Sequence, residues 1–325
     1  MTRSLEALEP GVRRFVESVC SESARLTAGR TLDWAQKRPI AEATRQAWRI
    51  GGPMMAETHE QTLSCASGEF RVRLYRPVAG DDALPALVYL HGGGWSIFSI
   101  DTHDRLMREY AHATGAVVVG VDYALSPEHR YPVALEQCVD TVRWLREHAQ
   151  DLRIDATRLA LGGDSAGANL ALCTALVLRD GGSRQRMRGL LLNYGGFDTA
   201  ISRDARATLG TPDDMLSGDE MDAFWDSYLG DDPSHRQDPF AVPMHASLRD
   251  LPPAFLVLAE RDVLAEQSER MAALMRAHDS PVQLQRYAGA SHSFLEAMSI
   301  SALAQQAIAD SADWLRRQLE IDRSP

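Results

Sequence analysis

One serine in this chain has the neighbours that a catalytic nucleophile needs. Gly163-Asp164-Ser165-Ala166-Gly167 places a Gly-x-Ser-x-Gly pattern between two apolar runs. This spacing is typical of a strand-turn-helix whose tight bend exposes the serine, and small residues on either side let the backbones cross. Free N–H groups and the positive end of the helix dipole would favour negative charge there. Because a glycine-rich turn with a helix-capping serine has the same pattern, the rest of the chain must supply a base, an acid and an oxyanion site.

Three consecutive glycines are the candidate oxyanion site. His91-Gly92-Gly93-Gly94-Trp95 directly follows an apolar run, and glycines leave backbone N–H groups free to face an open space. A flexible loop is the alternative, whereas a phosphate loop is disfavoured because neither phosphate-binding glycine pattern follows. We expect the N–H groups of Gly93, Gly94 and Ala166 to hold the oxyanion. His91 is expected to orient the loop rather than to act as the base.

The base should be a histidine beyond Ser165 if the chain order is serine, acid, histidine. His235 and His245 lie in a presumed lid region, and His278 ends an amphipathic helix, where a cation would satisfy the helix carbonyls. His292 lies in a glycine-containing loop just past the last strand pattern. Function in α/β sheets gathers at the carboxyl ends of strands, so His292 is the predicted base.

The acid should also leave the end of a strand. Residues 254–258 form an apolar run, followed by Glu260 and Asp262. Glu260 is expected to belong still to the strand, whereas Asp262 would reach the loop and face His292, holding its tautomer and stabilising the imidazolium. A role for Asp262 as the cap of the next helix is the alternative. Asp164 is interpreted as a structural carboxylate that fixes neighbouring loops.

Strand and helix patterns alternate along the chain and predict the frame that carries these residues. Continuous apolar runs are typical of strands buried on both faces of a parallel sheet, and alternation of strands with amphipathic helices predicts an α/β fold with a mostly parallel central sheet. The expected strands are 70–76, 85–90, 116–121, 159–161, 189–192, 254–258 and 282–284, and the expected helices are 101–114, 134–149, 166–179, 266–278 and 301–319.

Two segments fall outside this alternation. Residues 4–49 have helical periodicity, and residues 198–245 contain one amphipathic piece, Met221–Leu229, but no strand pattern. Long insertions often lie over the carboxyl ends of the strands as lids, although a surface excursion is the alternative. We expect a single domain over residues 1–325, with a helical cap formed by about residues 1–50 and 198–245.

Composition narrows the class of protein. The 325 residues are 45% hydrophobic, which is ordinary for a protein with a globular core. Their net charge of −11 argues against a nucleic-acid partner. Cys20, Cys65, Cys138 and Cys173 show no Cys-x-x-Cys pairing, and the first residues lack the apolar core of a signal peptide. No apolar run approaches the roughly 18 residues that cross a bilayer. These features predict a cytoplasmic protein without a membrane span.

Several motifs, in order, resemble one family. The glycine loop 91–95, the serine motif 163–167 and Asp122-Tyr123-Ala124-Leu125-Ser126-Pro127-Glu128-His129-Arg130-Tyr131-Pro132 are similar to the bacterial hormone-sensitive-lipase-like esterases, family IV carboxylesterases of the α/β-hydrolase superfamily. Asp262-Val263-Leu264 matches the acid segment of the family, and His292, with Phe294 beyond it, matches the base. The resemblance runs from about residue 60 to the C-terminus.

The chain departs from the family pattern at three places. Ala168 replaces a glycine after the serine motif, Ala265-Glu266-Gln267 replaces an acidic continuation, and Ser293 stands where glycine usually follows the histidine. The first two departures are expected to affect packing only. Ser293 is expected to bear on the geometry of the base.

The resemblance implies a serine carboxylesterase that hydrolyses short-chain esters through an acyl-enzyme intermediate. It implies a small-molecule ester as partner, no metal and no cofactor, and a homodimer formed through a sheet edge. Candidate pocket residues are Trp95, Phe98, Phe224 and Trp225. A ligand receptor on the same fold, which would be expected to lack the base, and a hydrolase of amides or an acyl transferase are the alternatives.

Overall fold

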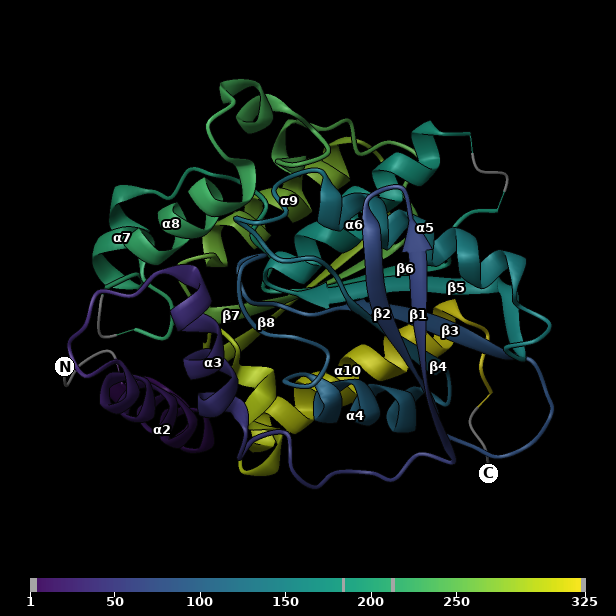
Figure 1. The fold of residues 1–325 in the computed structure, drawn as a ribbon, viewed down its shortest axis with the longest axis horizontal. Coiled ribbons are helices and arrows are strands. Elements are labelled where there is room, and N and C mark those ends of the chain that lie inside the picture. Colours follow the sequence, from purple (N-terminus) through teal and green to yellow (C-terminus); the bar gives the residue numbers. More distant parts are fainter. Residues whose placement is uncertain (1–4, 183–184, 212–213, 323–325) are drawn as a thin grey trace.

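An eight-stranded sheet forms the centre of the computed structural model, which describes residues 5–182, 185–211 and 214–322 (Figure 1). The strand order is β1-β2-β4-β3-β5-β6-β7-β8. β2 pairs antiparallel with β1 and β4, and the other neighbours pair in parallel. The strands are β1 (Glu57–Cys65), β2 (Gly68–Arg76), β3 (Leu84–Leu90), β4 (Val117–Asp122), β5 (Ile154–Asp164), β6 (Gly189–Asn193), β7 (Ala254–Arg261) and β8 (Val282–Ser291).

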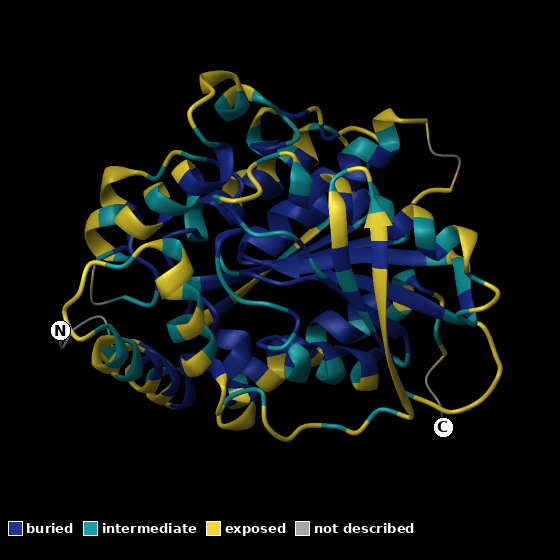
Figure 2. Ribbon diagram, in the orientation of Figure 1, coloured by how far each residue is buried: buried dark blue, intermediate teal, exposed yellow. Residues whose placement is uncertain are grey.

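Helices cover both faces of this sheet. The apolar sides of α5, α6 and α9 pack on one face, and those of α2, α4 and α10 lie on the other. Apart from Ala116, which precedes β4, the runs predicted as strands lie in strands, and the inner strands are buried on both faces (Figure 2). The α/β prediction is therefore confirmed. The helices of this frame are α4 (Asp104–Thr114), α5 (Val133–Glu147), α6 (Ala166–Asp180), α9 (Ala265–Ala277) and α10 (Ala302–Gln318).

The N-terminal helices α2 and α3 and the α7–α8 part of the 198–245 insertion lie at the left of Figure 1, and the rest of the insertion continues over the top. The N-terminal segment contributes α2 (Pro10–Thr27) and α3 (Trp34–Arg45), and α3 begins with a capping box between Asp33 and Gln36. The insertion has no strand within residues 198–211 and 214–245, as predicted. It contributes α7 (Arg203–Thr208), which the sequence did not predict, α8 (Gly218–Leu229) and the short 3-10 helices η1 (Pro233–Gln237) and η2 (Pro243–His245).

The edge strand β1 was also missed. Its sequence is polar, and Leu63 is its one buried residue, so the strand has no apolar periodicity (Figure 2). It forms because all nine of its residues pair with β2. None of the described helices is long and apolar enough to cross a membrane.

Candidate active site

The register of the parallel strands brings the three predicted site residues to one edge of the sheet. Ser165, Asp262 and His292 each come directly after the last residue of a strand, namely β5, β7 and β8. Arg261 pairs with Ser291 at the ends of β7 and β8, so the next residues, Asp262 and His292, are neighbours. The carboxyl ends of the strands thus bring the three candidate residues together, as the prediction assumed.

An unbroken chain of hydrogen bonds joins these three side chains. Nδ1 of His292 donates to Oδ2 of Asp262 over 2.8 Å, and Nε2 lies 3.0 Å from Oγ of Ser165. With the proton of the neutral ring on Nδ1, Nε2 is free to accept the serine proton. Oδ1 of Asp262 accepts from the N–H of Leu264 over 3.0 Å, so the carboxylate also fixes the turn before α9. The N-cap of α9 is Leu264 and it receives no side-chain capping bond, so Asp262 is not the cap of that helix.

The surroundings of His292 favour its protonation. Its side chain is 8% exposed and that of Asp262 is 1% exposed. Burial alone would disfavour the imidazolium, but the Asp262 carboxylate, followed by Asp164 and Glu296, raises the pKa of His292 above its ordinary value. A base with this pKa can take a proton from the serine and hold it during the reaction.

A strained turn presents Ser165. Its backbone has φ 54° and ψ −119°, a region that side chains rarely adopt. A Cβ atom on Gly167 would lie 1.9 Å from the carbonyl oxygen of Leu90, and one on Gly163 would lie 2.5 Å from the same oxygen. The two glycines therefore let the turn press against the end of β3, as the spacing predicted.

The glycine loop turns its backbone toward the same site. Gly93 and Gly94 have φ values of 113° and 55°, and both line the cavity that contains Ser165 and His292. In the described part of the chain, the N–H groups of Gly93, Gly94 and Ala166 have no hydrogen-bond acceptor. These donors are therefore available for a negatively charged oxygen.

The side chain of Asp164 holds this loop through a hydrogen bond from the N–H of Gly92. Its Oδ1 accepts from the N–H of Gly92 over 3.1 Å and from the Tyr89 hydroxyl over 3.0 Å, and its Oδ2 lies 3.3 Å from Nε2 of His103. Burial opposes ionisation of Asp164, but His103 and the Tyr89 hydroxyl lower its pKa below the ordinary value. Asp164 is thus a structural carboxylate that fixes neighbouring elements, as expected.

His91 supports the loop in a neutral form. Its ring stacks on Tyr123 at 4.2 Å, and its Nδ1 lies 2.7 Å from the carbonyl oxygen of Gly92. Burial and the neighbouring His103 lower the pKa of His91 to about 4. None of these interactions joins His91 to Ser165, which agrees with the predicted role of His91 in orienting the loop.

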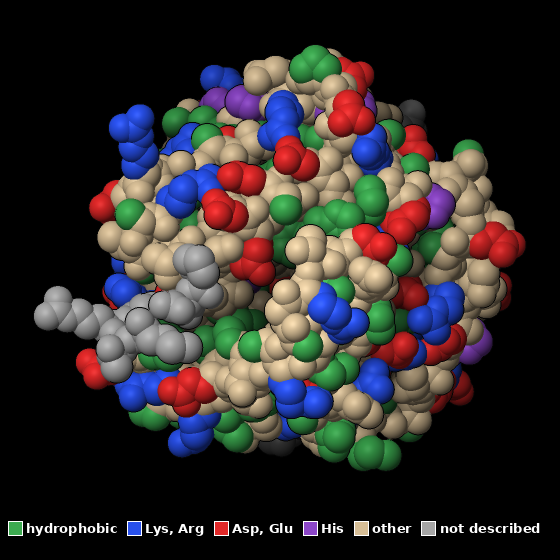
Figure 3. All heavy atoms as spheres, turned by 60° about the vertical axis from the view of Figure 1, so that its left-hand side comes forward, with side chains coloured by type: hydrophobic (Ala, Val, Ile, Leu, Met, Phe, Trp, Pro, Cys, Tyr) green, Lys and Arg blue, Asp and Glu red, His purple; other side chains and the backbone are tan. Residues whose placement is uncertain are grey.

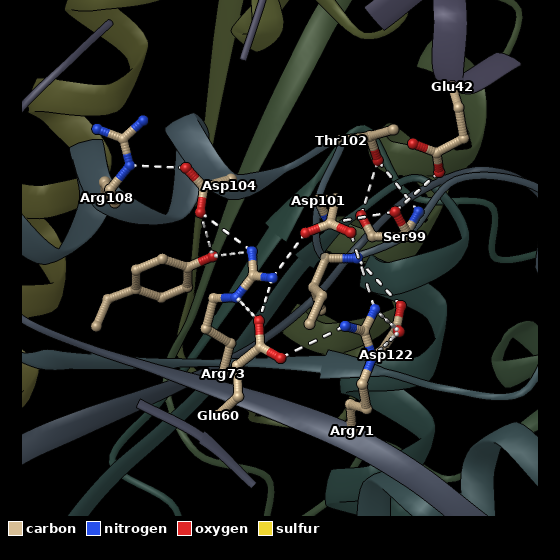
Figure 4. Close-up of polar contacts among 12 residues, drawn as sticks. Glu42, Glu60, Arg71, Arg73, Ser99, Asp101, Thr102, Asp104, Arg108 and Asp122 are labelled. Atoms are coloured by element: carbon tan, nitrogen blue, oxygen red, sulfur yellow. Dashed lines mark hydrogen bonds and ion pairs between the residues drawn. The ribbon is translucent and has the colours of Figure 1, made fainter. Parts of the chain in front are cut away.

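A network of ion pairs holds the stretch that follows the glycine loop (Figure 4). Arg73, on β2, reaches Asp101 over 2.7 Å and Asp104 over 3.2 Å, and Oδ1 of Asp122 accepts from the N–H of Ile100 over 3.2 Å. Glu42, on α3, accepts from the hydroxyl of Ser99 over 2.8 Å. The sequence did not predict this network, because its members come from segments far apart in the chain.

A cavity of about 480 Å³ opens over Ser165 and His292. Its walls come from α2, α3, the glycine loop and the insertion. In Figure 3 hydrophobic side chains lie along part of the edge of the hollow, and acidic side chains lie above it. Phe98 and Phe224 line it, as expected. Trp95 and Trp225 do not line it, which corrects that expectation. Their rings pack on each other at 4.4 Å in the core, where both side chains are buried.

The departures from the family pattern have distinct structural roles. Ser293 has φ 59°, in the left-handed region that favours glycine, and His292 beside it still reaches both partners. Ala168 is fully buried in α6.

Gln267 does more than the packing expected of it. Its Oε1 accepts from the N–H groups of Phe197 and Asp198 over 2.8 and 3.0 Å, and its Nε2 donates to the carbonyl oxygens of Asp198 and Ala200 over 2.9 and 3.1 Å. A buried amide satisfied in this way fixes the start of the insertion.

The remaining candidate side chains lie away from the centre. Glu260 lies within β7, as predicted, and its carboxylate accepts a hydrogen bond from the N–H of Gly289 over 3.2 Å. His278 accepts from the N–H of Leu248 over 2.9 Å through Nδ1, so it acts there as an acceptor rather than as the expected cation at the helix end. Across residues 5–182, 185–211 and 214–322, no three His, Cys, Asp or Glu side chains are grouped to hold a metal ion.

Known proteins resemble this chain in sequence and structure. Residues 87–296 match the model of a family described as alpha/beta hydrolase fold. The acetyl esterase of Salmonella typhi is 35% identical over 283 residues, 86% of this chain and 85% of that protein. A hyperthermophilic esterase from the archaeon Pyrobaculum calidifontis superimposes with a TM-score of 0.88 at 32% identity, covering 95% of this chain and 98% of the other. A thermostable carboxylesterase cloned from a metagenomic library gives a TM-score of 0.84 at 30% identity, covering 89% and 98%.

Proposed function

Because this chain belongs to the hormone-sensitive-lipase-like carboxylesterases of the α/β-hydrolase fold, we propose that it hydrolyses short-chain carboxylic esters with Ser165 as the nucleophile. The observation that carries this proposal is the hydrogen-bonded series Ser165–His292–Asp262, with distances of 3.0 and 2.8 Å, of which Ser165 and His292 line the cavity. No metal or cofactor enters the proposed reaction.

The proposed reaction has two halves. Nε2 of His292 takes the proton of Ser165 while Oγ attacks the ester carbonyl, and the N–H groups of Gly93, Gly94 and Ala166 hold the oxyanion. His292 then protonates the departing alcohol, and Asp262 stabilises the imidazolium in between. In the second half, His292 activates a water molecule that hydrolyses the acyl-enzyme and returns the proton to Ser165.

The size of the cavity supports a small acyl group. Its volume of about 480 Å³ lies in the lower half of the range of small-molecule pockets. Phe98 and Phe224 stand beside the glycine loop: a Cβ on Gly93 would lie 2.8 Å from the Phe98 ring and one on Gly94 would lie 2.1 Å from the Phe224 ring. The acetyl esterase name of the Salmonella relatives points the same way.

The test uses nitrophenyl acetate and butyrate. The protein should give a burst followed by steady turnover, and Ser165→Ala should lower kcat by about 10⁴-fold or more. A fluorophosphonate should label the protein and the exposed control variant Ser234→Ala but not Ser165→Ala. Normal turnover by Ser165→Ala would contradict the mechanism, and binding of esters without labelling would favour a receptor. Products formed with competing alcohols or amines would separate hydrolysis from acyl transfer.

The wider organisation is part of the proposal. The N-terminal segment 5–49 and the insertion 198–245 are taken together as the cap of a single domain, since both contribute walls to the cavity over Ser165. A homodimer would form through an edge of the sheet, whose two edge strands are β1 and β8. A cytoplasmic location is supported by four cysteines that form no disulfide in the described ranges.

A further inference from the structure

A buried arginine of the cap is paired with the loop that carries the base. Arg45 is the last residue of α3, and its Nε lies 2.8 Å from Oε2 of Glu296. The two side chains are only 4% and 5% exposed. Glu296 belongs to the 3-10 helix η3 (Phe294–Ser299), four residues beyond His292. Among the described residues, Arg45 is the one cation that pairs with Glu296. Because an unpaired buried charge is strongly unfavourable, the pair ties the seating of α3 to the position of η3.

The same guanidinium touches the support of the glycine loop. Its central carbon lies 4.8 Å from the ring of Phe98 and 5.4 Å from the ring of Phe15, on α2. Such cation–aromatic contacts are attractive and stronger when water is excluded. Phe98 in turn packs against Gly93, where a Cβ atom would lie 2.8 Å from the ring. Arg45 therefore contacts side chains that border both the oxyanion loop and the base loop, and it lines the cavity with Ser165.

We propose that the Arg45–Glu296 ion pair is a positioning device that couples the seating of cap helix α3 to the placement of His292 and the glycine loop. This inference rests on the proposed function, because it takes His292 as the base. In this proposal, neither Arg45 nor Glu296 touches the reacting atoms.

The two charges have opposite electrostatic effects on the base. Asp262, Asp164 and Glu296 are charged groups that act on His292, and each of them raises its pKa against the effect of burial. The positive charge of Arg45, next to Glu296, opposes the effect that the negative charge of Glu296 has on a nearby imidazole. The pKa of the nearby His103, which is lowered by burial and raised by Asp164, responds in this way: Glu296 raises it and Arg45 lowers it. Tyr194, whose ring lies 5.2 Å from that of His292, stays neutral because burial raises its pKa far above the ordinary value.

The experiment compares Arg45→Met, Glu296→Gln and the double variant in the full-length protein. The readouts are kcat and kcat/KM for nitrophenyl butyrate across pH, together with the rate of proteolytic cleavage within residues 5–49. In Arg45→Met, the unbalanced Glu296 should move the acid limb of kcat/KM to higher pH, and in Glu296→Gln the unbalanced Arg45 should move it to lower pH. Each shift should be about half a pH unit. In both variants kcat should fall by about tenfold or more through misplacement of the base.

The double variant removes both charges at once. Its acid limb should return to the position of the unaltered protein, because no unbalanced charge remains. Its kcat should stay reduced, and cleavage within residues 5–49 should be faster in all three variants, because α3 is no longer tied to η3. A purely structural role would lower activity without shifts of opposite sign.

Arg38→Met is the matched control. Arg38 also lies on α3 and also holds the core, through the carbonyl oxygens of Ser96 and Ser126 over 2.9 and 2.7 Å and through Glu128. None of these partners belongs to the base loop. Its loss should speed cleavage of the N-terminal segment but leave the acid limb where it was.

Acid limbs that stay in place, or that move in the same direction in both single variants, would overturn the proposal. If a single variant does not fold, the neutral double variant tests the proposal instead. An unaltered kcat together with unaltered resistance to cleavage in that variant would also overturn the proposal. A full-length protein without ester turnover would instead contradict the proposed function. Cleavage within residues 5–49 in Glu296→Gln, whose altered residue lies on η3 outside the cleaved segment, would still report on the tie between α3 and η3.

Discussion

Replacement of Asp164 by alanine should weaken the fold and the active site together, because this buried carboxylate joins three elements. It accepts from Tyr89 on β3 and from the N–H of Gly92 in the glycine loop, and it lies 3.3 Å from Nε2 of His103 before α4. Loss of one partner of a buried charged pair typically costs about 3–5 kcal/mol, and each abandoned donor about 1–3 kcal/mol. Since these penalties overlap, we expect the free energy of unfolding to fall by about 4 kcal/mol near pH 6.

The loss should depend on pH in a defined direction. The pKa of Asp164 is lowered in the folded protein, so its stabilisation is present above its ordinary value of 3.8 and is lost as the pH falls through the folded value. Although burial opposes protonation of His103, Asp164 raises its pKa, so this part is fully present below the ordinary value of 6.5 and is lost as the pH rises through the folded value. The difference between the unaltered protein and Asp164→Ala should therefore be larger at pH 6 than at pH 9.

Urea unfolding at pH 6 and pH 9 measures this difference, and nitrophenyl butyrate turnover measures the effect on the active site. We expect kcat to fall by about 10- to 100-fold, because the N–H of Gly92 loses its anchor while Ser165 and His292 remain. Asp164→Asn is the matched control. It keeps an acceptor for Tyr89 and Gly92 but loses the charge that pairs with His103, so the free energy of unfolding should fall less than in Asp164→Ala, by about 3 kcal/mol. Unaltered stability of Asp164→Ala, or a penalty that grows toward pH 9, would refute the reasoning. A loss of kcat equal to that of Ser165→Ala would mean that Asp164 takes part in the chemistry.

Two further substitutions test the base and the oxyanion loop. Asp262→Asn should lower kcat by about 10³-fold or more and move the acid limb of kcat/KM to lower pH, because the carboxylate that raises the pKa of His292 is gone. An unmoved limb in the pH profile would contradict this role. Gly94→Ala places a Cβ atom 2.1 Å from the Phe224 ring at a φ of 55°, so kcat should fall by about 10²-fold. Thermal unfolding separates this loss from misfolding, and unchanged kcat in a folded variant would argue against Gly94 as an oxyanion donor.

The parts of the fold that the sequence predicted are those with a local signal. Residues 116–121 and 189–192 are apolar throughout because both faces of their strands are covered, and such runs are visible without any neighbour. The candidate site residues were predictable for a related reason, since Ser165 and His292 each follow a strand. Ser165 also lies between two glycines that the close backbone contact requires, and Gly289, with φ 77°, precedes His292 by three residues. Their mutual distances follow from the register of the parallel strands.

The parts that were missed depend on contacts between distant segments. β1 is polar, and it becomes a strand only by pairing with β2. The four hydrogen bonds of Gln267 connect it to residues about 70 positions away. Trp95 follows the glycine loop and Trp225 lies in the insertion, which made both candidates for the pocket, yet their rings pack on each other in the core. Residue type and periodicity contain no information about these partners.

The contact between the serine turn and β3 has a consequence for motion in this enzyme. Gly163 and Gly167 leave no side chain between their backbone and the carbonyl oxygen of Leu90, the last residue of β3. The glycine loop continues directly from Leu90, so the candidate nucleophile Ser165 and the proposed oxyanion donors share a close backbone contact at the end of β3. His292 stands on a different strand, and the cavity walls come from helices outside the sheet. Adjustment to substrates of different shape must therefore occur in the base loop and the cap. Slow conformational exchange, measured by relaxation dispersion, should be confined to these parts and absent from the amides of Gly93 and Ala166.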